Sequence, residues 1–192
     1  MPTLELYFII IYTMKTLRKS FIFSLLAFAV LLSGCTQSTT LPLVVLHPHE
    51  DAPQNTGEYT SVFLAGTIDM GSAVDWQAEA AELFGAKAGS FLLFNPRQQE
   101  WHPEREGEMD YQVGWELEHL ERADYILMNI LPGSLSPITL LELGLHARGG
   151  KLYVVCSPGF SRYDNVRITC ARYSVPLFSS LEEAIEAIPN KH

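Results

Sequence analysis

The chain has 192 residues, of which 47% are hydrophobic and 18% charged, a composition typical of one globular domain and not of a disordered segment. Its 13 basic against 22 acidic side chains give a net charge of −9, which argues against a protein that binds the phosphate backbone of nucleic acids. Three cysteines are too few for a disulfide framework.

The first 34 residues are typical of a secretory signal peptide and are predicted to be removed. A cationic patch begins at Met14, an apolar run covers residues 21–32, and the segment closes on Leu-Ser-Gly-Cys35. This order resembles a bacterial lipoprotein signal, which implies that Cys35 is acylated and becomes the first mature residue. Residues 1–13 are interpreted as an over-extended start, and an uncleaved signal anchor is the alternative.

The lipoprotein resemblance predicts a protein in the bacterial cell envelope, held to a membrane by lipid at Cys35. Because Thr36 and not Asp follows Cys35, the resemblance points to the outer membrane, facing the periplasm, in a bacterium with two membranes. Residues 35–42 form the lipidated cysteine and a polar tether, and residues 43–192 form the folded domain. Cys156 and Cys170 would then lie in an oxidising compartment, and whether they pair stays open.

From residue 43 onward, short β-branched or aromatic runs alternate with longer helical segments, which predicts βαβ units. The expected strands are 43–46 (a short leading strand), 61–65, 91–94, 125–131, 151–156 and 175–178. The expected helices are 73–84, with a buried stripe of Val74, Ala78, Ala81 and Phe84, then 111–123, 137–148, 165–173, and a last one opened by a capping box at Ser180. We therefore predict an α/β fold with a doubly wound parallel sheet of about five strands and helices on both faces.

Ligands of such sheets bind at the carboxyl ends of the strands, near the point where the strand order reverses. Glu142 is the first candidate there, because it lies in a helix that is apolar on nearly every side and begins at this edge. A carboxylate in such a place is costly unless it is paired or used, and it suits a nucleophile. The alternative is a buried glutamate satisfied by a local donor such as His146.

Glu116 is the second carboxylate, on a helix face shared with Gln112 and His119, whereas Val113, Leu117 and Leu120 form the more apolar face. Glycosyl chemistry often needs two carboxyl groups, one to attack and one to protonate the leaving group. A solvated helix face is the competing interpretation.

Further candidates follow the strands. Gly66 ends a strand tightly, and Asp69, just past this turn, is a minor candidate to accept hydrogen bonds from a sugar or base. An Asp in a loop is more often a turn former, which is the alternative. Asn95 and Arg97 follow the next strand and are candidates for a ligand hydroxyl or phosphate, although turn-forming roles suit them equally. No zinc spacing, dinucleotide fingerprint or phosphate-binding loop occurs, so we expect no metal and no cofactor.

These segments together resemble one family, the nucleoside 2-deoxyribosyltransferases, and in particular their divergent second branch. The resemblance rests on residues 62–69, 95–97, 115–118, 123–124 and above all on Ser136-Pro-Ile-Thr-Leu-Leu-Glu142-Leu-Gly144, and it extends over residues 43–188. It implies a flavodoxin-like fold and a dimer-based homo-oligomer.

The resemblance also implies roles for single residues. Glu142 matches the nucleophile that attacks C1′ of a 2′-deoxynucleoside to form a glycosyl-enzyme, and Glu116 stands where the family has an Asp that contacts the base. Asn165 resembles an asparagine that a neighbouring subunit supplies to the sugar 5′-hydroxyl. This chain departs from the family at Ser136, where better-known members have an Asp, and in the first strand, where a Tyr is replaced by Val62 or Phe63.

The sequence thus predicts glycosyl transfer or N-glycosidic cleavage on a deoxynucleoside or nucleotide, with Arg97 hinting at a phosphate. A non-catalytic nucleoside-binding lipoprotein is the alternative from another class, and a purely structural envelope lipoprotein is a third.

Overall fold

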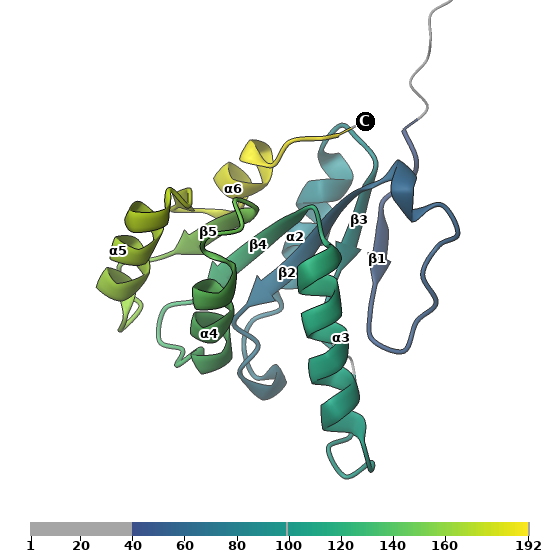
Figure 1. Cartoon of the computed structure of the whole chain (residues 1–192), viewed down its shortest axis with the longest axis horizontal. Coiled ribbons are helices and arrows are strands. Elements are labelled where there is room, and N and C mark those ends of the chain that lie inside the picture. Colours follow the sequence, from purple (N-terminus) through teal and green to yellow (C-terminus); the bar gives the residue numbers. More distant parts are fainter. Residues whose placement is uncertain (1–39, 99, 192) are drawn as a thin grey trace, which may run out of the picture. The chain divides into compact units, whose positions relative to one another are not determined.

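The structure is a computed structural model that describes residues 40–98 and 100–191 (Figure 1). The predicted signal peptide and Cys35 lie outside these residues. The strands are β1 (Val44–Leu46), β2 (Thr60–Gly66), β3 (Phe91–Phe94), β4 (Tyr125–Ile130), β5 (Leu152–Cys156) and β6 (Leu177–Phe178). The α-helices are α2 (Trp76–Ala86), α3 (Glu108–Arg122), α4 (Pro137–His146), α5 (Tyr163–Tyr173) and α6 (Leu181–Ala187), and two 3₁₀ turns, η1 (Thr56–Glu58) and η2 (Asp69–Gly71), flank β2.

The strands form one parallel sheet in the order β1-β3-β2-β4-β5-β6. The chain leaves β2 toward β3 on one side, then crosses back to β4 on the other side of β2. The strand order therefore reverses between β2 and β4, where Gly66 lies opposite Asn129. This confirms the predicted doubly wound α/β sheet, with six strands in place of about five, because the leading run at Val44–Leu46 pairs with β3.

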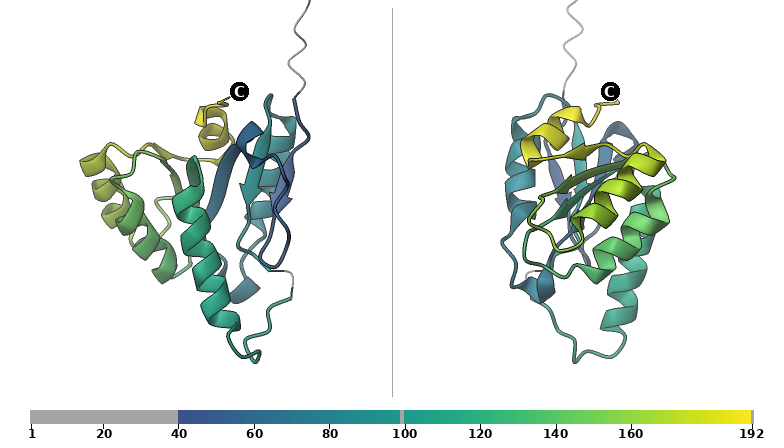
Figure 2. Two further views of the ribbon diagram at one scale, coloured as in Figure 1. Left: turned by 45° about the vertical axis from the view of Figure 1, so that its right-hand side comes forward. Right: turned by 90° about the vertical axis from the view of Figure 1, so that its left-hand side faces the viewer.

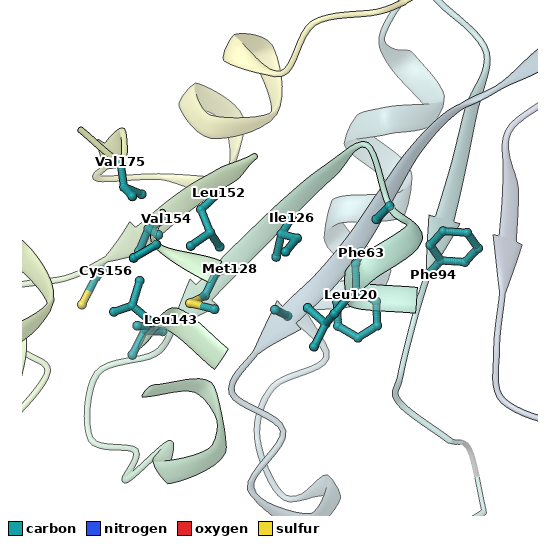
Figure 3. Packing of buried hydrophobic residues seen from close by; sticks show 14 of the residues in the cluster. Phe63, Phe94, Leu120, Ile126, Met128, Leu143, Leu152, Val154, Cys156 and Val175 are labelled. Atoms are coloured by element: carbon teal, nitrogen blue, oxygen red, sulfur yellow. The ribbon is translucent and has the colours of Figure 1, made fainter. Parts of the chain in front are cut away.

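Helices cover both faces of the sheet (Figure 2). Residues of α3, α4 and α5 pack on one face with Phe63, Met128 and Val154, and Figure 3 shows part of this cluster. Residues of α2 and α6 pack on the other face with Val62, Leu64 and Leu127. Alternate residues of β2 and β4 thus enter opposite clusters, which is why both strands read as continuous apolar runs.

The orientation of α3 corrects the prediction from its sequence. We expected Val113, Leu117 and Leu120 to form the packed face, but Val113 and Leu117 are exposed, and only Leu120 of the three is buried. The helix instead buries Gln112 and His119, whose polar atoms find partners: His119 Nδ1 lies 2.7 Å from the carbonyl oxygen of Trp115. A polar face is buried because its hydrogen bonds are supplied on folding.

The register of α2 also differs from the prediction. The helix begins at Trp76, after Asp75, whose carboxylate accepts a hydrogen bond from the backbone N–H of Ala78. Val74, predicted to be buried, is 75% exposed, and the buried stripe is Trp76, Gln77, Ala80 and Phe84. The N-cap thus begins the helix three residues later than the apolar periodicity suggested.

The two cysteines of the domain, Cys156 and Cys170, are buried as free thiols in the same cluster as Met128. Burial raises the pKa of each thiol to about 11, so neither is a reactive thiolate at neutral pH. Within the described part of the chain, no helix has both the length and the hydropathy needed to span a bilayer.

Candidate active site

The carboxyl ends of β2 and β4 meet unusually closely, and Gly66 makes this possible. Its φ of +141° is one that residues with a side chain rarely adopt, and a Cβ built on it would lie 2.2 Å from the carbonyl oxygen of Asn129. The next residue, Thr67, donates its backbone N–H to that same oxygen at 2.9 Å. Gly66 therefore shapes the sheet edge by close backbone approach.

Three buried hydroxyl groups cluster at this edge, those of Thr67, Ser134 and Ser136. Ser136 Oγ lies 2.7 Å from Thr67 Oγ1 and 2.8 Å from Ser134 Oγ, and the remaining pair is 3.2 Å apart. Ser134 donates its hydrogen to the carbonyl oxygen of Leu131, and Leu131 donates its backbone N–H to Thr67 Oγ1. The cluster links the end of β2 to the segment that leads into α4.

The hydrogens of this cluster can be counted. Each hydroxyl has one hydrogen, and that of Ser134 points to a carbonyl oxygen, so the two shortest contacts need the hydrogens of Thr67 and Ser136. Thr67 therefore donates to Ser136, and Ser136 donates to Ser134, so each of the three hydroxyl hydrogens has an acceptor. Although Ser136 stands at the N-cap position of α4, its side chain makes no N-cap hydrogen bond. Its side chain holds the cluster instead, and its φ of 44° places it in the left-handed region just before Pro137.

Glu142 lies in the second turn of α4 and is 8% exposed. Burial, together with a smaller effect of the negative charge of Glu116, raises the pKa of its carboxyl group to about 8. This outweighs the weak preference for the ionised form that the dipole of a helix gives a carboxyl group near its N-terminus. The alternative partner His146, four residues on, makes no hydrogen bond to Glu142 in the described structure. Glu142 is thus a buried carboxyl group with unused hydrogen-bonding capacity.

Glu116 is half-buried on α3, and its electrostatic effect on Glu142 brings the two predicted carboxyl groups into one site. Burial raises the pKa of Glu116, while a hydrogen bond from Gln112 Nε2 to Glu116 Oε1, 2.7 Å long, opposes this shift. Both carboxyl groups therefore hold protons more tightly than a carboxyl group in water. Because burial and the charge of Glu116 raise the pKa of Glu142 to about 8, the pair retains a proton near neutral pH.

Arg97 and Asn95 are engaged within the protein. Arg97 donates from Nε to Gln77 Oε1 at 3.1 Å and from Nη2 to the carbonyl oxygens of Ala73 and Val74. Asn95 Oδ1 accepts the backbone N–H of Arg97 at 3.0 Å, which closes a local turn. These contacts fit the turn-forming alternative, and a ligand role for either residue stays a prediction.

In the described structure, neither Asp69 nor Asn165 makes a hydrogen bond to Glu142 or Glu116. Asp69 is exposed in η2 with a φ of 46°. Asn165, on α5, lines a pocket of about 350 Å³ between α4 and α5, and neither Glu142 nor Glu116 is among the residues that form it. Arg162 and Thr169 supply its other polar side chains, and Leu140, Leu143, Gly144 and Val166 complete its lining. Within one chain, Asn165 therefore lines a pocket to which neither carboxyl group contributes.

Sequence reasoning missed three polar residues that organise the site: Thr67, Gln112 and Gln98. The spacing of Gln112, four residues before Glu116, was the available signal, since such pairs meet on a helix surface. Nothing local marked Gln98, which reaches Gln112 from a loop 14 positions away. Among the described residues, no group of three or more His, Cys, Asp or Glu side chains is arranged to hold a metal ion.

The comparison with protein families gives one match. A family described as nucleoside 2-deoxyribosyltransferase like matches residues 59–160, which is more than half of the chain. The chain belongs to this family. The match confirms the resemblance seen in the sequence, and its span runs from β2 to the loop after β5, including Glu116, Ser136 and Glu142. No curated protein matches the sequence.

A solved structure shares the fold of this nucleoside 2-deoxyribosyltransferase-like domain. It is a conserved protein from Enterococcus faecalis V583, with a TM-score of 0.51 and 13% sequence identity. The match covers 67% of this chain and 96% of that one. At this identity the likeness speaks for the architecture alone, and it agrees with the flavodoxin-like sheet described above.

Proposed function

We propose that the domain binds a 2′-deoxynucleoside or nucleotide and breaks its N-glycosidic bond, with Glu142 as the nucleophile. The observation that carries the proposal is the placement of Glu142: a buried carboxyl group with no hydrogen bond from any described residue, beside a second carboxyl group, in a member of a family associated with glycosyl transfer. A buried carboxyl group kept without a partner is costly, and catalysis is the use that fits this setting.

In the proposed first step, an oxygen of ionised Glu142 attacks C1′ of the sugar. A C1′–O bond forms, the bond from C1′ to the base nitrogen breaks, and its electron pair leaves with the base. Glu116, in its protonated form, supplies the proton for that nitrogen. In the second step a water molecule or another base attacks C1′ and releases Glu142. Two displacements at one carbon retain the anomeric configuration.

The experiment incubates the full-length protein with a 2′-deoxynucleoside, with and without a second free base, and separates the products by chromatography. A new deoxynucleoside in the presence of the second base indicates transfer, and free base with deoxyribose indicates hydrolysis. Glu142→Gln is expected to abolish either product while the far-UV circular dichroism spectrum stays unchanged. No Glu142-dependent product from several bases and their monophosphates would contradict the proposal.

One observation favours the alternative, a non-catalytic nucleoside-binding domain. Burial holds a proton on Glu142 near neutral pH, and a protonated carboxyl group is a hydrogen-bond donor for a ligand and a poor nucleophile. This alternative predicts that calorimetry detects binding of a deoxynucleoside to a wild-type protein that does not turn it over. The product assay separates the two functions.

We also propose that a second copy of the chain covers the outer face of α3 and α4. The large apolar side chains exposed there are Val113, Leu117, Ile138, Leu141 and Leu145. Large apolar side chains exposed on two helices that cover the same face of the sheet are costly in water and are typical of a subunit interface. The separation of Asn165 from the two carboxyl groups supports the same proposal, because a neighbouring subunit would then be the source of this amide.

We further propose that lipid at Cys35 anchors the protein and that the protein lies in the bacterial cell envelope. The support is the order of the cationic patch, the apolar run and the small residues before Cys35. Mass spectrometry of the protein from a bacterial host tests it: the N-terminal peptide should carry an acylated Cys35. Cys35→Ser should leave the signal peptide uncleaved and without lipid.

A further inference from the structure

A line of side-chain hydrogen bonds runs from the surface to Glu116. His49 Nε2 lies 2.9 Å from Glu108 Oε1, and Gln98 Nε2 donates to the same oxygen at 3.0 Å. Gln98 Nε2 also donates to Gln112 Oε1 at 2.6 Å. Gln112 Nε2 then donates to Glu116 Oε1 at 2.7 Å. Four contacts thus join a histidine on the exposed loop after β1 to a carboxyl group of the site.

Glu108, near the surface end of this line, fixes which group donates and which accepts in each hydrogen bond. Hydrogen bonds from His49 and Gln98 hold the pKa of Glu108 below its usual value, so Glu108 is a carboxylate, which only accepts. Gln98 must therefore point its amide nitrogen at Glu108, and both hydrogens of that nitrogen are used. Gln112 in turn must present its amide oxygen to Gln98.

Gln112 consequently has a defined orientation in a buried place. Its amide nitrogen donates one hydrogen to Glu116 and the other to the carbonyl oxygen of Pro96, 2.9 Å away. All of its amide hydrogens have acceptors, and its oxygen has a donor, so a flipped amide would lose three hydrogen bonds at once. The side chain is 8% exposed, which leaves water little room to replace them.

The same contacts orient Glu116. One of its oxygens, Oε1, is held by Gln112, while Oε2 accepts no hydrogen bond from any residue in the described part of the chain. Side-chain amides do not pass protons along such a line under ordinary conditions, so the line is a means of orientation and not of proton transfer. Its effect is to leave one particular oxygen of Glu116, Oε2, available to a ligand.

We propose that Gln112 is a positioning residue of the site: it fixes the orientation of the Glu116 carboxyl group, and Gln98 and Glu108 fix the orientation of Gln112. This inference rests on the proposed function, since the orientation of Glu116 affects turnover only if Glu116 takes part in it. It adds to the proposed function three residues outside the two carboxyl groups, whose hydrogen bonds hold Glu116 in one orientation.

The first test is Gln112→Glu, which is nearly isosteric. It keeps an acceptor for Gln98 and removes both donors, so Glu116 loses its hydrogen bond without a cavity being made. We expect kcat to fall by roughly 10- to 100-fold, the usual scale for a misplaced catalytic group, with a smaller change in KM. Glu118→Gln, on the exposed side of the same helix, is the matched control and should keep the wild-type kcat.

The double variant Gln112→Glu/Glu116→Gln separates positioning from stability. The two side chains exchange donor and acceptor, so the hydrogen bond between them is restored and Tm should return toward that of the wild type. Turnover should stay low, because the carboxyl group has moved by one helical turn. Recovery of kcat together with Tm would show a purely structural role for Gln112 and overturn the inference.

A readout without turnover makes the two proposals distinguishable. Carbon-13 NMR of labelled glutamate follows the titration of Glu116 in the wild type and in Gln112→Met, with Glu116→Gln to assign its resonance. We expect the titration to move to higher pH in Gln112→Met and to stay in place in Glu118→Gln. A wild type without Glu142-dependent product would overturn the proposed function alone, whereas an unmoved Glu116 titration would overturn the positioning role, whatever the activity.

Discussion

The charge of Glu116 on α3 acts on Glu142 on α4, and this relationship adds to burial in setting the protonation of the site. The charge of Glu116 adds to burial in raising the pKa of Glu142 to about 8, while Gln112 partly stabilises the ionised form of Glu116. Near neutral pH the free protein therefore keeps a proton on the pair, mainly on Glu142. The pH dependence of both stability and turnover follows from this arrangement.

The free energy of unfolding is expected to depend on Glu142. In the unfolded chain its pKa returns to about 4.3, so between about pH 4.5 and 8 the folded protein binds a proton that the unfolded chain has lost. Its contribution to stability is fully present below that window and is lost by the time the pH has risen through 8, a change on the order of 5 kcal/mol. Urea denaturation from pH 5 to 9 measures it. Glu142→Gln should flatten the curve, and parallel curves for the two proteins would contradict the raised pKa.

Turnover should fall with pH in the range where stability falls. In the proposed first step the pair holds one proton, which must lie on Glu116 while Glu142 is ionised, so kcat/KM is expected to fall as the pH rises through the pKa of about 8 and the pair loses that proton. In Glu116→Gln the proton donor is gone, and the residual activity should instead rise with pH as Glu142 ionises. A wild-type kcat/KM that keeps rising above pH 8 would be inconsistent with Glu116 as the proton donor.

Gly66→Ala is expected to destabilise the domain. The new Cβ would meet the carbonyl oxygen of Asn129 at 2.2 Å, with φ in a strained region. Since backbone atoms have to move, the loss should be at least about 2 kcal/mol in the free energy of unfolding, measured by chemical denaturation. Gly144→Ala is the control: it lies inside α4 with no atom near the added Cβ, and it should be neutral or stabilising.

Thr67→Val tests the hydroxyl cluster. The replacement keeps the shape but removes the acceptor of the Leu131 N–H and the donor to Ser136, both of which are buried. We expect a loss of about 1–3 kcal/mol, the usual cost of leaving buried polar groups unpaired. Thermal denaturation beside Ser161→Ala, which removes an exposed hydroxyl, measures the difference. A Tm equal to that of the control would show that the cluster does not hold the edge together.

Leu141→Glu tests the proposed subunit interface. It places a charge among the exposed apolar residues of α3 and α4 and should convert an oligomer to a monomer in light scattering. Val74→Glu, at a position that is 75% exposed just before α2, should leave the molar mass unchanged. A wild-type protein that is already monomeric at micromolar concentration would contradict a second copy on this face.

The local pattern of the sequence determined the sheet and the place of Glu142. Strands buried on both faces read as continuous apolar runs, Pro137 and Gly149 bracket α4, and a carboxylate among leucines indicates a special role. The family resemblance rested on these same residues, and the family match confirms it.

Only the tertiary structure decided which face of α3 is buried and what holds Glu116. By hydrophobicity alone, Val113 and Leu117 should face inward, yet Gln112 takes the inner place because Pro96 and Gln98, distant in sequence, supply its hydrogen bonds. In the same way, Ser136 has the residue type of an N-cap but bonds to Thr67, 69 positions away. The burial cost of a polar side chain depends on partners that only folding brings near, and no local pattern records those partners.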